Sequence, residues 1–150
     1  MRSGDSRPFD RAAILLVDDN RDGVLARRTV LEELGYQVFA ASSGNDALHT
    51  IEERPCDLVI TDYKMSPMNG LELIAKLRER NFRNPIILLT GFADSLGLKP
   101  DNTGADLVLQ KNANEVASLV RHTKRLLNVP RKPARSQLFR AMKRSKTAGA

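Results

Sequence analysis

The sequence predicts an α/β fold in which a five-stranded parallel sheet carries helices on both faces. Two observations lead to this fold class: five short apolar segments recur along the chain, and amphipathic helical segments separate most of them. A strand that is apolar at nearly every position is buried on both sides, as happens in parallel sheets covered by helices. The length of 150 residues suits one globular domain with a core of its own.

The first predicted strand is the apolar run 12–17, which ends in the acidic pair Asp18-Asp19. Gly35 is the expected stop of the helix that follows. The inward stripe of this helix is predicted from residues at helical spacing: Val24, Arg28, Leu31 and Leu34. A second strand is expected at 37–41.

Ser43, followed three residues later by Asp46, predicts the N-terminus of the second helix, which Pro55 ends. Residues 57–62 form the third predicted strand, which again ends in a carboxylate, that of Asp62. After a turn at 66–70, a third helix is marked by apolar residues at helical spacing: Leu71, Ile74 and Leu77.

The fourth predicted strand, 85–90, ends in the hydroxyl of Thr90, and the fifth, 107–110, ends at Lys111. Between these strands the helix that the pattern requires is interrupted by Gly91, Gly97, Pro100 and Gly104. We therefore expect at most one helical turn there, or a loop. Asn112 with Glu115 resembles a capping box and predicts the start of a last amphipathic helix.

Charge divides the chain into a flexible N-terminal segment (1–11), a folded domain (12–128) and a basic tail (129–150). The net charge is +6, but seven of the 24 basic residues and none of the 18 acidic ones lie in 128–150, which leaves 17 basic residues against 18 acidic ones before it. The tail is expected to be disordered or partly helical, with docking onto an acidic partner or weak nucleic-acid contact as the alternatives. It is too short for a DNA-binding module, so nucleic acid is not an expected partner.

Composition also excludes several classes of protein. Cys56 is the single cysteine, which excludes an internal disulfide framework and a multi-thiolate metal site. We expect a cytoplasmic protein without membrane association, because no run approaches a membrane span and the N-terminus has no apolar export signal. A nucleotide-binding enzyme is not supported, since no glycine-rich loop follows the first strand.

Chemically useful residues stand where the predicted strands end. In a parallel sheet these ends share one edge, where ligands bind. That edge should gather three carboxylates, one hydroxyl and one ammonium group, those of Asp18, Asp19, Asp62, Thr90 and Lys111. Close carboxylates repel one another unless a cation neutralises them, and hard oxygen ligands suit Mg²⁺. A carboxylate can also attack phosphorus, and a lysine can neutralise the incoming phosphoryl group.

These residues, in this order and spacing, resemble the receiver domain of two-component response regulators over residues 14–127. The motifs are Asp18-Asp19, the segment 62–70 (Asp-Tyr-Lys-Met-Ser-Pro-Met-Asn-Gly), Thr90-Gly91, and Lys111 after Gly104-Ala105-Asp106. The resemblance implies a flavodoxin-like receiver fold and a phosphorelay protein that receives its phosphoryl group from a histidine kinase or phosphotransfer protein.

The resemblance also implies a role for each site residue. Asp62 would be the phosphoacceptor, Asp19 would ligate Mg²⁺ directly, and Asp18 would act through water. The backbone carbonyl of Lys64 would complete the metal shell, while Thr90 and Lys111 would contact the phosphoryl group. Such a protein is not a conventional enzyme, but it would catalyse its own phosphorylation and dephosphorylation at Asp62. The downstream protein partner and the oligomeric state stay open.

The sequence departs from the family where phosphorylation is usually reported to a partner. Val108 stands where a Tyr or Phe is usual, Asn112 replaces the proline that usually follows the lysine, and the fourth helix is largely erased. The turn also reads Met-Ser-Pro at 65–67, a minor change. Two hypotheses result: a stand-alone phosphoacceptor switch that signals through protein contacts, and a pseudo-receiver that is a constitutive interaction module.

Overall fold

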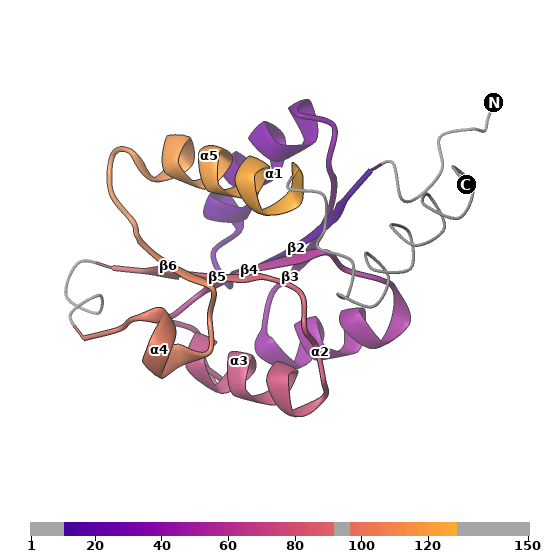
Figure 1. Cartoon of the computed structure of the whole chain (residues 1–150), viewed down its shortest axis with the longest axis vertical. Helices are drawn as coiled ribbons and strands as arrows, with labels where there is room; N and C mark the ends of the chain where they lie inside the picture. The colour runs from indigo at the N-terminus through magenta and orange to yellow at the C-terminus, as the bar shows by residue number, and fades with distance from the viewer. Residues whose placement is uncertain (1–10, 92–96, 129–150) are drawn as a thin grey trace, which may run out of the picture.

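The computed structural model describes residues 11–91 and 97–128 (Figure 1). The predicted N-terminal segment lies outside these residues except for Arg11, and the predicted basic tail at 129–150 lies wholly outside them.

Five parallel strands form one sheet in the order β3-β2-β4-β5-β6. The strands are β2 (Ala13–Val17), β3 (Gln37–Ala41), β4 (Leu58–Asp62), β5 (Ile86–Thr90) and β6 (Leu107–Gln110). The chain runs from β2 to one side, into β3, and then returns to β4 on the other side of β2. The loops after β2 and β4 therefore part in opposite directions, and such a switch point leaves a crevice for a ligand. The predicted five-stranded parallel sheet is confirmed.

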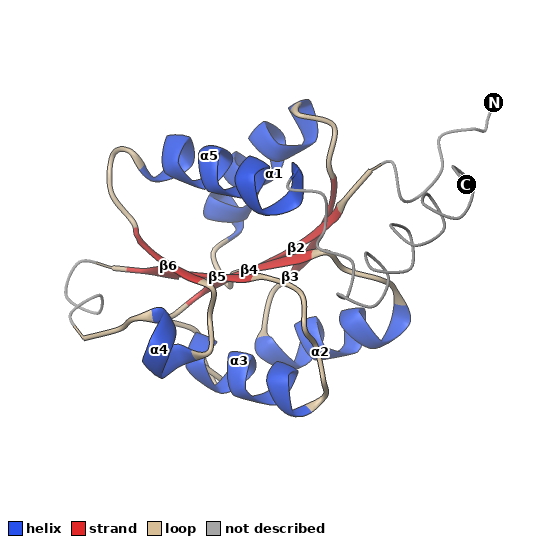
Figure 2. Cartoon of the chain, viewed as in Figure 1, coloured by secondary structure: helices blue, strands red, loops and turns tan. Residues whose placement is uncertain are grey.

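Helices cover both faces of the sheet, as Figures 1 and 2 show. One face carries α1 (Arg21–Glu33) and α5 (Glu115–Asn128), and the other carries α2 (Gly44–Glu53), α3 (Gly70–Glu79) and α4 (Pro100–Thr103). In the described part of the segment between β5 and β6, residues 97–106, α4 is a short helix of four residues, which Pro100 begins and Gly104 ends with a φ of 82°. Within the described ranges, no helix is long and apolar enough to cross a membrane.

Alternate side chains of the strands point into two separate cores. Ile14 and Leu16 of β2 pack on the side of α1 and α5, whereas Leu15 and Val17 pack on the side of α2 and α3. The side chains of β4 and β5 are distributed in the same alternating way. All five residues of β2, β4 and β5 are buried, which explains why these segments are apolar throughout.

Side-chain caps begin the helices close to the ends of the strands. Asn20 accepts hydrogen bonds from the backbone N–H groups of Asp22 and Gly23, so α1 starts directly after the acidic pair. Ser43 caps α2 by accepting from the N–H of Asp46 at 3.1 Å, as the sequence predicts. Asn69 forms a reciprocal capping box with Glu72 at the start of α3.

The inward stripe of α1 differs from the expectation at two positions. Leu34 is not part of the helix but its C-cap, and it is 39% exposed. Arg28 was expected to face inward, but its side chain is 41% exposed and pairs with Glu32. The preceding residue, Arg27, is buried instead, together with Leu31. The reason is electrostatic: Arg27 meets the buried carboxylate of Asp18 and the partly buried carboxylate of Glu115, which together can hold a guanidinium away from water.

Gly70 and Gly44 offer a matched test of packing around the loop that follows β4, because each is the first residue of its helix. A Cβ at Gly70 would lie 2.4 Å from the backbone oxygen of Asp62, whereas a Cβ at Gly44 would meet the flexible end of Met68. We expect Gly70→Ala to lower the free energy of unfolding by about 1–3 kcal/mol and Gly44→Ala to change it by less than about 1 kcal/mol. Urea denaturation measures both, and equal losses would contradict this account.

Candidate functional site

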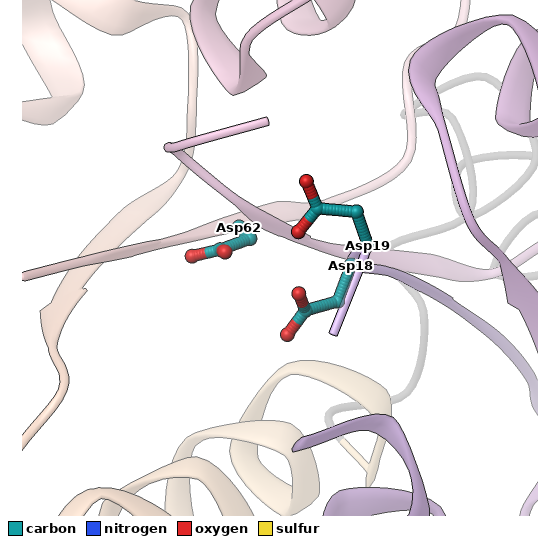
Figure 3. Close-up of side chains that lie close together, drawn as sticks. All are labelled: Asp18, Asp19 and Asp62. Atoms are coloured by element: carbon teal, nitrogen blue, oxygen red, sulfur yellow. The ribbon is translucent and has the colours of Figure 1, made fainter. Parts of the chain in front are cut away.

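Three carboxylates meet where β2 and β4 end side by side. Val17 pairs with Thr61 in the sheet, so the residues that follow them, Asp18 and Asp62, lie at the same edge. Asp18, Asp19 and Asp62 each offer one oxygen within 4.8 Å of the others (Figure 3). We call these three residues the acidic cluster. Asp18 and Asp62 are buried, whereas Asp19 is exposed.

Lys111 reaches the acidic cluster from the end of β6. Its Nζ lies 2.5 Å from Oδ1 of Asp62, which also accepts a hydrogen bond from the N–H of Tyr63 at 3.1 Å. The backbone N–H of Lys111 donates to the carbonyl of Thr90 at 2.7 Å, which fixes the lysine beside the end of β5. The sequence-predicted lysine and aspartate are thus in direct contact, although 49 residues separate them.

Burial and neighbouring charges act on Asp62 in opposite directions. Burial raises the pKa of its carboxyl, the ion pair with Lys111 lowers it, and the nearby Asp18 raises it again. The balance leaves the pKa of Asp62 above its ordinary value. The carboxylate is therefore less well hydrated and less stabilised than a surface aspartate, which suits a nucleophile or a cation ligand.

Thr90 and Lys64, the other two predicted site residues, also lie at this edge of the sheet, but they differ from each other in burial. Thr90 is fully buried at the end of β5, and its Oγ1 is 3.5 Å from the carbonyl of Leu109. Lys64 follows Asp62 by two residues in the β4–α3 loop and is exposed. The structure thus brings together Asp18, Asp19, Asp62 and Lys111, and places Thr90 on the next strand.

Arg27 is the residue of the site that the sequence analysis missed. Its Nη1 donates to Oδ2 of Asp18 at 2.8 Å, while its Nε and Nη2 donate to the two carboxylate oxygens of Glu115 at 2.6 and 3.1 Å. Burial opposes the charge of Arg27, but the contacts with Glu115 and Asp18 outweigh burial and raise its pKa. Two charged residues thus offset the acidic cluster: Lys111 on Asp62 and Arg27 on Asp18.

Glu115 therefore does not complete the capping box expected at the start of α5. Its carboxylate is bidentate to Arg27, and the start of the helix is organised by Asn112, whose Oδ1 accepts from the N–H of Asn114 at 2.8 Å. A charged partner outcompetes a backbone N–H for a carboxylate because charge-assisted bonds are stronger. One sequence signal points to this network, namely a glycine inside α1, Gly23, one helical turn before Arg27.

The donor set of the acidic cluster fits Mg²⁺. Three carboxylates from three side chains present hard oxygen ligands, and the open side at the exposed Asp19 leaves room for the waters that Mg²⁺ retains. A hollow of about 500 Å³ opens beside Asp18 and Asp19, between α1 and the segment that follows β3. Charged and polar side chains from both elements line it, among them Arg21, Arg28, Ser42 and Asp46.

Comparison with known protein families agrees with this arrangement. The model of the response regulator receiver domain matches residues 14–122. The sensor protein EvgS of Escherichia coli K12 is 41% identical over 86 residues, which are 57% of this chain and 7% of EvgS. The Bacillus subtilis alkaline phosphatase synthesis transcriptional regulatory protein PhoP is 35% identical over 102 residues, 65% of this chain and 41% of PhoP. The chain thus spans less than half of either relative.

Solved structures show the same fold. The response regulator TrrA of Thermotoga maritima, crystallised in complex with Mg²⁺-BeF, is 31% identical with a TM-score of 0.68, over 77% of this chain and 98% of TrrA. The receiver domain of a signal transduction histidine kinase from Syntrophus aciditrophicus is 31% identical with a TM-score of 0.71, over 82% of this chain and 96% of that domain. This similarity confirms the flavodoxin-like receiver fold.

The opposing effects on Asp62 give a test of its environment. Lys111→Met removes the main group that lowers the pKa of Asp62, so that pKa should rise further and the carboxylate should take up a proton at higher pH than in the wild type. ¹³C NMR titration of the aspartate carboxyl groups, in EDTA so that no divalent cation contributes, measures the shift. Lys76→Met, an exposed substitution on α3, is the control and should leave the titration unchanged. An unmoved midpoint in Lys111→Met would show that the ion pair has no effect on Asp62.

Proposed function

The chain belongs to the response regulator receiver domain family, and from this membership we propose that it is a phosphoacceptor signalling switch of a two-component system. The observation that carries the proposal is the acidic cluster with Lys111 placed on Asp62. Asp62 is the phosphoacceptor, and the donor is a phosphohistidine of a histidine kinase or phosphotransfer protein.

Phosphoryl transfer requires a carboxylate that is ionised and held in place. An oxygen of Asp62 forms the new bond to phosphorus while the P–N bond of the phosphohistidine breaks, and the released imidazole keeps the electron pair of that bond and is protonated. Lys111 holds Asp62 through Oδ1 and offers a positive charge for the phosphoryl oxygens. The reaction needs no further covalent participation by the protein, so positioning and charge account for the catalysis of phosphorylation and dephosphorylation.

Mg²⁺ is the cofactor of this proposal. When bound, it neutralises the negative charge of the phosphoryl oxygens. Asp19, the exposed member of the acidic cluster, would be the direct ligand, Asp18 would act through water, and Asp62 and the backbone carbonyl of Lys64 would complete the protein's share. Thr90 supplies its hydroxyl to the phosphoryl group once that group occupies the end of β4.

The remaining parts of the proposal concern the chain as a whole. The folded unit is 12–128. The family match over 14–122 supports these bounds, as do β2 and α5, the first and last elements along the described chain. Its location is the cytoplasm, where a reducing environment suits the free, buried thiol of Cys56. The output is a contact with a downstream protein.

A pseudo-receiver is the second candidate, and specific observations favour it. The position of the usual aromatic residue holds Val108, which pairs with Leu88 in the sheet and has no ring to turn inward. The helix α4, part of the face that normally changes on phosphorylation, has four residues. Asn112 follows Lys111 where the family usually has a proline. In this candidate the fold is a constitutive binding module.

Phosphorylation can be measured directly. With Mg²⁺ and phosphoramidate, whose P–N bond is like that of phosphohistidine, the protein should gain one phosphoryl group by intact-mass spectrometry. Asp62→Asn should gain none, because an amide is a far weaker nucleophile than a carboxylate. Asp101→Asn, on an exposed residue of α4, is the matched control and should be modified like the wild type. A missing modification in the wild type, or one that persists in Asp62→Asn, overturns the proposal.

A second measurement separates a switch from a constitutive module. Beryllium fluoride with Mg²⁺ imitates a phosphoryl group, and a switch should respond with amide chemical-shift changes that extend from Asp62 into residues 97–112. A pseudo-receiver should give the same ¹H–¹⁵N spectrum with and without the reagent. Asp62→Asn serves as the control, since it lacks the carboxylate to which the reagent attaches.

A further inference from the structure

Arg27 links the acidic cluster to α5 through one buried and one partly buried ion pair. Side-chain exposure is 8% for Arg27, 3% for Asp18 and 11% for Glu115. A single guanidinium is thus shared between a carboxylate at the end of β2 and the first residue of α5, which is 88 residues away from it in the sequence. None of the roles proposed above uses Arg27 or Glu115.

We propose that Arg27 is a positioning residue that serves as a built-in counter-cation of the acidic cluster, so that it weakens divalent-cation binding and ties occupancy of the cluster to α5 through Glu115. This inference rests on the proposed function in one respect, namely that the acidic cluster is the divalent-cation site.

Gly23 provides independent support from within α1. A Cβ at this position would lie 3.1 Å from Nη1 of Arg27 and 3.2 Å from Oδ2 of Asp18. Glycine is unfavourable inside a helix, because it loses more conformational freedom than other residues. Here its missing side chain leaves the space in which the guanidinium reaches Asp18. A side chain at position 23 would therefore press on this ion pair, and glycine leaves it room.

The geometry makes Arg27 and a divalent cation compete for the same carboxylate. Oδ1 of Asp18 accepts the N–H of Asn20 at 2.9 Å, and Oδ2 accepts Arg27 at 2.8 Å, so both oxygens of Asp18 already have partners in the protein. A positive charge in low-dielectric surroundings also repels an incoming cation. Both effects act in the same direction, so Arg27 lowers the affinity of the acidic cluster for a divalent cation.

Glu115 has the opposite effect, because it holds the same guanidinium by two hydrogen bonds and draws its charge away from Asp18. When a cation enters the cluster, repulsion weakens the contact of Arg27 with Asp18, and Arg27 is left to Glu115. Because binding linkage is reciprocal, a change at Glu115 must alter cation affinity as well. Binding of a cation to the cluster is therefore coupled to the start of α5 through Arg27 and Glu115, and this coupling needs no aromatic residue at position 108.

Isothermal titration calorimetry with MgCl₂ as the sole ligand tests the proposal on the full chain, at physiological ionic strength and without a phosphodonor. Arg27→Gln should bind Mg²⁺ about tenfold more tightly than the wild type, as expected when a neighbouring positive charge is removed. Arg27→Lys keeps the charge and should restore an affinity near that of the wild type. Glu115→Gln should bind Mg²⁺ more weakly, since it releases Arg27 to Asp18.

An exposed ion pair between α2 and the end of α3 supplies matched controls. Arg80→Gln and Glu52→Gln make the same changes of charge in an ion pair whose side chains are 51% and 61% exposed. Solvent and salt screen these charges, so Mg²⁺ affinity should change by less than about twofold in either variant. Far-UV circular dichroism in EDTA verifies that each variant is folded before the titration.

The directions in which Arg27→Gln and Glu115→Gln change the Mg²⁺ affinity distinguish the proposal from a purely structural role. A purely structural role for Arg27 predicts weaker Mg²⁺ binding in both Arg27→Gln and Glu115→Gln, because both disturb the site. A folded Arg27→Gln whose affinity is unchanged or lower overturns the proposal. Should Arg27→Gln fail to fold, Glu115→Gln still tests the proposal, since an affinity equal to or higher than that of the wild type overturns it.

Failure of this inference and failure of the proposed function give different results. If phosphoramidate does not modify Asp62, the phosphoacceptor function is lost, but the order of Mg²⁺ affinities among the variants still supports or overturns the role of Arg27. If Asp62 is modified and the affinities do not follow the expected order, the switch stands and Arg27 is only structural. If neither the wild type nor Arg27→Gln binds Mg²⁺, the counter-cation role is overturned.

Discussion

Repulsion among three carboxylates at the ends of two adjacent strands is the constraint on which this structure depends. The parallel pairing of β2 with β4 brings Asp18 and Asp62 to one edge, and burial removes the water that would otherwise screen them. Buried charges persist only when they are paired. Lys111, which follows β6, pairs with Asp62, and Arg27 of α1 pairs with Asp18.

The two cations are held very differently, and the difference matters for function. The side chain of Lys111 is 32% exposed and makes a single ion pair with Asp62, so it can follow a phosphoryl group with little structural change. Arg27 is enclosed and makes three hydrogen bonds to two carboxylates. Removing one partner of such a network typically costs about 3–5 kcal/mol. Lys111 is suited to chemistry, and Arg27 to holding α1, β2 and α5 in one arrangement.

The elements around β5 and β6 are short or only partly buried, whereas the edge of the sheet that carries the acidic cluster holds all of its expected charged residues. The helix α4 is one turn long, β6 is only partly buried, and Val108 packs against the core as an ordinary aliphatic residue. The start of α3 at Gly70 is by contrast packed against the backbone of Asp62, where a Cβ would clash. Packing therefore fixes the position of the acidic cluster more tightly than it fixes the face formed by α4 and β6.

The sequence alone determined which residues stand at the ends of the strands. Asp18, Asp19, Asp62, Thr90 and Lys111 could be placed at one edge because parallel strands all end on the same side of a sheet. Proline and glycine likewise predicted the short α4, since their restrictions are local.

The tertiary structure decided which charges pair across the fold. Arg27 and Arg28 are adjacent arginines, and the inward stripe of a helix is wide enough to include either of them. The choice depends on Asp18 and on Glu115, two carboxylates contributed by other elements, with Glu115 88 residues away. Local patterns contain no information about such a partner, because the energy of a buried ion pair depends on distances that only the folded chain sets.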